Sequence, residues 1–206
     1  PLSTSVGRYL ELLREPLFMF HALTGGVAMA GMFAYIAGSP YVFMELFQVP
    51  ADDYAWLFGS VATCFILTAQ LNSRMLRRWT QLQLIRRMTA VYMLATCTLL
   101  LVAWLHVDSL WLFMPPLFVS VGVIALVLPT ASACALAGHG HQAGVASALM
   151  GTMQFIIAGI TSALVGILHN DSAVPMAGVM AVCGVLTVLM ALMAHRVSVR
   201  QSAASI

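Results

Sequence analysis

The chain has 206 residues, of which 61% are hydrophobic and only 8% are charged. An average soluble domain carries roughly 25% charged residues, so this composition argues against a soluble enzyme and against a disordered segment. The net charge is +2, from nine arginines and seven acidic residues. That surplus is too small to indicate a nucleic-acid partner, and we expect a membrane protein whose partner is the lipid bilayer.

Six apolar stretches are long enough to cross a bilayer, which takes about 20 residues of helix. The alternating pattern of a membrane barrel strand is absent. The sequence therefore predicts an all-α membrane protein with six transmembrane helices in a domain over residues 17–194. The predicted spans are 17–39, 54–71, 88–105, 110–137, 145–168 and 176–194.

The arginines indicate the orientation of these helices. They occur in residues 1–16, in the segment between the second and third spans, which includes Arg74, Arg77 and Arg78, and in residues 195–206. With six spans, all of these segments lie on one side of the membrane. The positive-inside rule places that side in the cytoplasm, so we expect a cytoplasmic lead-in, a cytoplasmic loop and a cytoplasmic tail. The opposite loops carry acids, including Asp108, and no arginine.

Small residues recur along two of the spans and predict close helix packing. The third span has no glycine and the sixth is mostly Met, Val, Leu and Ala, so we expect these two helices to face lipid on the outside of the bundle. The small residues with which we expect other helices to pack are Gly26, Ala30, Ala34 and Gly38 in the first span and Gly151 in the fifth.

Prolines interrupt the first and fourth spans, at Pro40 and Pro129. Each removes a backbone donor and can kink or end a helix. If the six helices form two three-helix repeats, the two breaks fall at comparable places. Paired interruptions of this kind indicate the binding site of a transporter. The alternative is a packing kink without function.

Chemistry-bearing residues are few. His21 and Glu45 lie near the ends of the first span, where we expect interfacial positions, and His139 and His141 are expected in a solvated loop. The four cysteines lie inside apolar runs and are expected to be small buried residues. No catalytic motif occurs. We therefore expect no enzyme, no catalytic residue, no metal site and no cofactor.

Three segments resemble one known family. Residues 33–43 read FAYIAGSPYVF, residues 71–74 read LNSR and residues 144–155 read GVASALMGTMQF. They resemble the seventh helix, the entry to the loop after the eighth helix, and the eleventh helix of the Bcr/CflA drug-efflux transporters, a branch of the major facilitator superfamily. The resemblance runs along nearly the whole chain in the same order.

This resemblance implies that the chain is the carboxy-terminal half, helices seven to twelve, of a twelve-helix transporter of the bacterial inner membrane. It implies drug/proton antiport by alternating access, with bicyclomycin, chloramphenicol or sulfonamide-like substrates. Its partners are then a small-molecule drug, protons and an amino-terminal six-helix half that is missing here. That half holds the acids usually credited with proton coupling. Since Pro1 is not a methionine, the chain is open to being a fragment.

In this family the first and fourth helices of each half line the central cavity, which matches the two spans that carry prolines. Two alternatives for single residues remain: an interhelical hydrogen bond for Gln154 and plain packing for Phe118. Two alternatives for the function also remain: a major facilitator exporter of metabolites or amino acids, and a non-transporting truncated six-helix protein. The expected substrate contacts are Tyr35, Ser39, Phe43, Phe118, Thr130 and Gln154.

Overall fold

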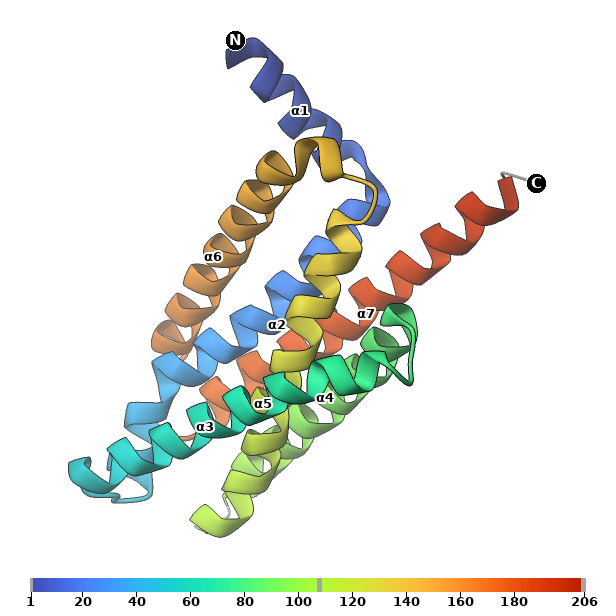
Figure 1. The fold of residues 1–206 in the computed structure, drawn as a ribbon. Helices are drawn as coiled ribbons and strands as arrows, with labels where there is room; N and C mark the ends of the chain where they lie inside the picture. Colours follow the sequence, from blue (N-terminus) through green and yellow to red (C-terminus); the bar gives the residue numbers. More distant parts are fainter. Residues whose placement is uncertain (1, 107–108, 205–206) are drawn as a thin grey trace.

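The computed structural model describes residues 2–106 and 109–204, and every long element in this part is an α-helix (Figure 1). Six of the helices are long and apolar enough to cross a membrane, which confirms the predicted all-α membrane fold. Asp108 lies outside the described residues. The six spans are α2 (Pro16–Pro40) continued by the π-helix η1 (Tyr41–Leu46), α3 (Ala51–Leu76), α4 (Gln81–Trp104), α5 (Leu110–Leu136), α6 (Ala143–Ile167) and α7 (Val174–Ala204).

The helices extend beyond the apolar stretches from which they were predicted. The lead-in forms a separate helix, α1 (Leu2–Arg14), whose Leu12 is fully buried, and α7 runs on into the predicted tail. At the start of α4, the Thr80 hydroxyl accepts the Gln83 N–H at 3.3 Å and the Gln83 side chain accepts the Thr80 N–H at 3.2 Å. This capping box begins the helix seven residues before its apolar stretch. Hydropathy therefore locates the part of a helix that crosses the hydrocarbon, whereas capping residues locate where the helix begins.

Helices α2 and α5 form the centre of the bundle. In each, 61% of the apolar window is buried, against 6% in α3 and 22% in α6. Helix α2 packs against α5, α6 and α7, while α4 packs against α5 and α7 (Figure 1). Helices α4 and α7 also have exposed apolar faces, with Leu94 and Val182 among the exposed side chains, although α3 and α6 are the most exposed helices. The lipid-facing position expected for the third and sixth spans therefore stays a prediction.

Glycines on α2 and α7 make room for side chains of α4. A Cβ at Gly31 of α2 would lie 1.9 Å from the Tyr92 hydroxyl oxygen, and one at Gly184 of α7 would lie 2.3 Å from the Thr96 hydroxyl oxygen. The third span lacks glycine, which is the feature from which a lipid-facing helix is expected. In the structure α4 contributes the side chains that fill the glycine sites of its neighbours.

The two prolines differ in their effect. At Pro40 the α-helix gives way to the π-helical turns of η1. At Pro129 there is no break, since α5 stays α-helical to Leu136, and the predicted helix break there is wrong. A membrane helix tolerates an internal proline where its surroundings satisfy the freed backbone groups. Pro129 itself is exposed, whereas Val127, Thr130 and Ala131 beside it are buried.

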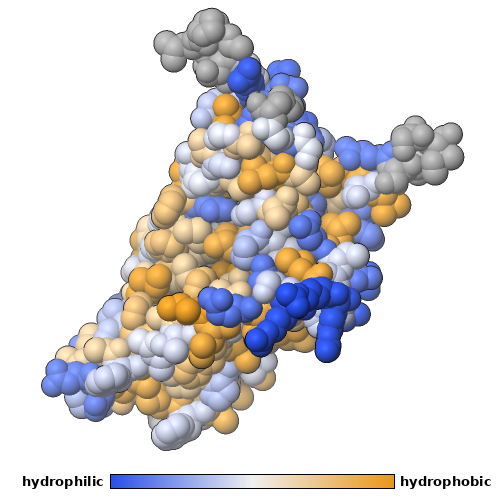
Figure 2. Space-filling view, in the orientation of Figure 1, coloured by the Kyte–Doolittle hydropathy of each residue, from blue (hydrophilic) through white to orange (hydrophobic). Residues whose placement is uncertain are grey.

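Apolar side chains cover the middle of the face drawn in Figure 2, and hydrophilic ones gather near the turn between α3 and α4. Arg74 lies in the last turn of α3, and Arg77 and Arg78 follow it. Of the four cysteines, Cys183 is buried as predicted, Cys64 and Cys134 are half-buried, and Cys97 is exposed on α4. Its side chain lies on the face of α4 that no described helix covers.

Candidate substrate-binding site

Aromatic rings from four elements form a continuous cluster at the end of the bundle away from the arginines. The Tyr35 ring of α2 stacks on Phe58 of α3, with centroids 5.8 Å apart and planes 12° from parallel. The Phe58 ring contacts Tyr54 at 6.0 Å, and Tyr54 contacts Phe43 of η1 at 6.1 Å. Phe43 in turn meets Phe113 of α5 edge-on at 6.3 Å. Two of the predicted substrate contacts, Tyr35 and Phe43, therefore lie in one aromatic cluster.

Ser39 connects this cluster to the proline. Pro40 has no N–H, so it cannot serve the carbonyl of Ile36 four residues earlier. The Ser39 hydroxyl lies 3.4 Å from that carbonyl oxygen and 2.9 Å from the Tyr54 hydroxyl oxygen on α3. Ser39 is fully buried. Its hydroxyl thus links the backbone that the proline leaves unpaired to the neighbouring helix.

A cavity of about 300 Å³ opens beside the stacked pair, between α2 and α3. The one polar side-chain group among its lining residues is the hydroxyl of Tyr35. That oxygen is buried and has no hydrogen-bond partner among the described residues. Apolar cavities with a few placed polar groups are typical of small-molecule sites. The residues that line this cavity besides Tyr35 are Met32, Ile36, Phe58, Val61, Ala62, Phe65, Ile66 and Val121.

Thr130 and Gln154 lie apart from this cluster, toward the arginine-bearing end. The Thr130 hydroxyl donates to the Leu126 carbonyl at 2.7 Å and to the Asn72 side-chain oxygen of α3 at 3.3 Å. Gln154 packs against Gly26, where a Cβ would lie 3.4 Å from its Cγ. Gly26 and Tyr35 are nine residues apart on α2, which is about 14 Å along a helix axis. The predicted contacts thus form two groups along α2 rather than one site.

Two residues had alternative interpretations. The half-buried Gln154 amide makes no hydrogen bond with the described residues; the bonds from α6 to α2 come from Thr161 to the Ala30 carbonyl at 3.1 Å and from Ser162 to the Phe33 carbonyl at 3.5 Å. Phe118 is half-buried and packs on the core around the aromatic cluster.

The predicted packing residues differ in their surroundings. Ala30 and Ala34 are fully buried, and a Cβ at Gly38 would lie 2.7 Å from the Met176 side chain of α7. A Cβ at Gly151 would meet nothing within 4 Å in the described part of the chain. The close packing at Gly151 therefore stays a prediction.

Sequence analysis missed the α3 half of the aromatic cluster. Tyr54 and Phe58 are four residues apart, a spacing that places both on one face of a helix, and this was the signal available for them. It also misplaced His139, which was expected in a solvated loop. His139 is only 7% exposed, because its ring packs edge-on against Phe18 and bonds to Glu15. Within the described residues no group of three metal-binding side chains occurs.

Two curated proteins resemble this chain. An uncharacterized MFS-type transporter, YdgK, of Bacillus subtilis is 32% identical over 90% of this chain, and a bicyclomycin resistance protein homolog of Haemophilus influenzae is 26% identical over 88%. No family model matches the chain. The chain is a homologue of major-facilitator-type transporters, which confirms the resemblance found in its sequence. It spans 46% and 45% of the two relatives, as expected for one half of such a transporter.

Proposed function

We propose that this chain is the carboxy-terminal half of a secondary active multidrug exporter that exchanges drugs for protons by alternating access. The observation that carries the proposal is the cavity beside Tyr35 and Phe58, in a chain related to a bicyclomycin resistance protein homolog. Aromatic faces hold flat or cationic drugs, and one free hydroxyl orients them. The proposed substrates are bicyclomycin, chloramphenicol or sulfonamide-like compounds.

The position of α2 supports a substrate path along this helix. This helix carries the aromatic cluster near one end and packs on Gln154 toward the other. A substrate moving along α2 therefore contacts first the aromatic side chains and then the amide of Gln154. The π-helical turns of η1 lie where the aromatic cluster meets the end of α2. Such turns occur frequently at functional sites, and we assign η1 to the part of the path that changes shape.

Proton binding is assigned to the other half of the transporter. The described carboxylates lie in α1, at the ends of the spans or in the connecting segments, and none lies in the middle of a span. A carboxylate inside a span would be the expected proton carrier. Sequencing the coding DNA upstream of Pro1 tests this assignment. A reading frame with six further spans supports it, and a start codon next to Pro1 would contradict it.

The transport activity is tested with the complete reading frame expressed in drug-sensitive bacteria that lack their own exporters. We expect lower drug accumulation in expressing cells, and we expect this difference to vanish when an uncoupler collapses the proton gradient. Accumulation that stays low without the gradient would overturn the antiport mechanism. Unchanged accumulation of all three drug classes, with export of amino acids instead, would favour the metabolite exporter.

A further inference from the structure

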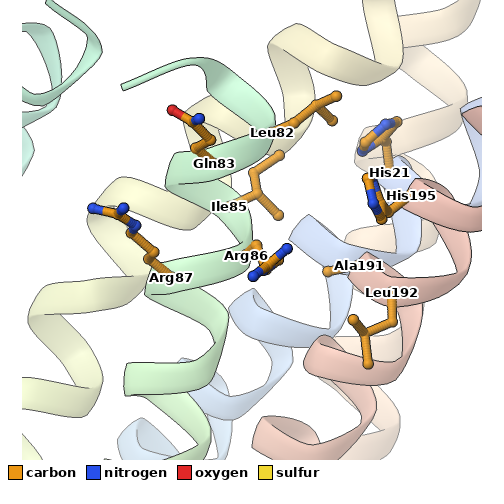
Figure 3. A pocket seen from close by; sticks show the side chains of 9 residues that line it. All are labelled: His21, Leu82, Gln83, Ile85, Arg86, Arg87, Ala191, Leu192 and His195. Carbon is orange, nitrogen blue, oxygen red and sulfur yellow. The ribbon is translucent and has the colours of Figure 1, made fainter. Parts of the chain in front are cut away.

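A second cavity, of about 230 Å³, lies at the opposite, arginine-bearing end of the bundle. It is enclosed by the first turns of α2, the first turns of α4 and the last membrane turns of α7 (Figure 3). Its polar lining consists of His21, His195, Arg86, Arg87 and Gln83, and the residues that line it include no carboxylate. The proposed drug path does not use this cavity.

His21 is the most unusual of these groups. His21 is only 4% exposed, and its Nδ1 atom is buried without a hydrogen-bond partner among the described residues. A buried polar atom left unpaired is destabilising, so such atoms usually have a partner. His21 lines the cavity, so a ligand bound there would lie beside its imidazole.

The charges around the cavity specify the kind of partner. Arg86 extends from α4 toward the imidazoles of His21 and His195, whereas Arg87 extends away from them (Figure 3) and lies 4.7 Å from the centroid of the Trp79 ring. Arg86 makes no ion pair with a carboxylate of the described chain. A guanidinium carries five donors and no acceptor, and an imidazole supplies at least one donor. The complementary ligand is an anion with several acceptor oxygens.

We propose that this cavity binds a phosphate-bearing anion, held by Arg86, His21 and His195. Two apolar side chains stand at its rim, Leu82 and Leu192, each 41% exposed. Arginine pairs strongly with phosphate through its forked donors, and exposed leucines beside such a group suit the acyl chains of a phospholipid. The lipid headgroup is therefore the favoured source of the phosphate, with free phosphate as the other.

The test uses the transporter expressed from its complete gene, purified and delipidated in a neutral detergent. Dioctanoyl phosphatidylglycerol and inorganic phosphate are titrated separately, and the melting temperature and native mass spectrum are recorded. We expect a saturable rise in melting temperature with at least one of the two probes. A rise with the lipid alone identifies a headgroup site, and an equal rise with inorganic phosphate identifies a site for the free anion.

The variants distinguish the cavity from general surface charge. Arg86→Gln should weaken the saturable binding about tenfold or more, since a hydrogen bond to a charged group is worth that factor, and His195→Asn should weaken it severalfold. Arg77→Gln is the matched control. It removes the same charge from an exposed arginine outside the cavity, and should change binding by less than about twofold.

Two results would overturn the proposal: no saturable response to either probe, or an equal loss in Arg77→Gln and Arg86→Gln. Arg86 and His195 are exposed, so their variants are expected to fold. A His21→Gln variant adds a test of the buried partner, and a melting temperature in the absence of ligand verifies its folding. These measurements do not depend on drug transport, so a failure of this proposal can be distinguished from a failure of the proposed function.

Discussion

The carboxylate of Glu15 and the imidazole of His139 meet at 2.6 Å, joining the first residue before α2 to the segment that follows α5. The other ring nitrogen of His139 lies 3.1 Å from the Ala135 carbonyl oxygen. This contact closes the arginine-bearing end of the bundle around Phe18, which packs edge-on against the same ring.

Neutralising the carboxylate tests this contact. Glu15→Gln should lower the free energy of unfolding by about 1 kcal/mol, a modest value for a charge-assisted bond because the Glu15 side chain is 37% exposed. Thermal unfolding in detergent measures the change. Glu11→Gln is the control, since Glu11 is exposed on the neighbouring helix α1. Equal effects of the two substitutions would contradict a specific contribution of the Glu15–His139 contact to stability.

The contact between Gly31 and Tyr92 predicts a specific steric defect. Gly31→Ala should destabilise the bundle by about 1–3 kcal/mol, because its Cβ would overlap the Tyr92 hydroxyl. Tyr92→Phe removes the overlapping atom, so the double variant should regain most of the lost stability. Gly159→Ala serves as the control, since a Cβ there meets nothing within 4 Å. The heat resistance of the purified protein, followed by size-exclusion chromatography, reports the result. A double variant no more stable than Gly31→Ala alone would contradict the prediction.

The hydrogen bond between Ser39 and Tyr54 should appear as coupling between two single variants. Ser39→Ala and Tyr54→Phe should each cost about 0.5–1.5 kcal/mol, and the double variant should cost less than their sum because both remove the same bond. Unfolding of all four proteins completes the cycle. Ser60→Ala, which removes an exposed hydroxyl from α3, should have little effect. Additive losses would show that the two hydroxyls act independently.

Tyr35 offers a way to separate binding from folding. Its buried hydroxyl has no hydrogen-bond partner in the described part of the chain, so Tyr35→Phe should leave stability unchanged or raise it by up to about 1 kcal/mol. The same variant should alter the resistance profile of expressing cells, since it removes the one polar side-chain group among the residues that line the cavity. Minimum inhibitory concentrations for the three drug classes measure this change. An unchanged profile would exclude the Tyr35 hydroxyl from the substrate site.

Gln154 is expected to act at the other end of the path. Gln154→Ala should shift drug preference without loss of membrane-inserted protein, because its amide is not used for bonding within the described chain. Thr152→Ala is the control, as Thr152 is exposed on the same helix and bonds to the Ala148 carbonyl. Resistance profiles and membrane protein levels are compared side by side. Identical profiles for the two variants would exclude Gln154.

The pattern of hydropathy along the chain was sufficient to predict the class of protein and the number of its spans. Crossing hydrocarbon requires about 20 apolar residues in a helix whose backbone bonds are satisfied internally, and this requirement is local and leaves a visible pattern. The sequence motifs around Ser39–Pro40 and around Gln154 were likewise sufficient to show the family resemblance. The extent of the helices was less accessible, because a cap such as Thr80–Gln83 extends α4 outside its apolar stretch.

Which helices are central and which residues meet depends on how the helices pack against one another. Both sides of a close contact are apolar in lipid, so hydropathy does not distinguish the buried Tyr92 of α4 from a lipid-facing side chain. Shape does, because the site that accepts Tyr92 is a glycine on another helix. The stack of Tyr35 on Phe58, the burial of His139 and the unpartnered nitrogen of His21 are likewise relations between distant segments. They arise from packing between helices, which no single stretch of the sequence contains.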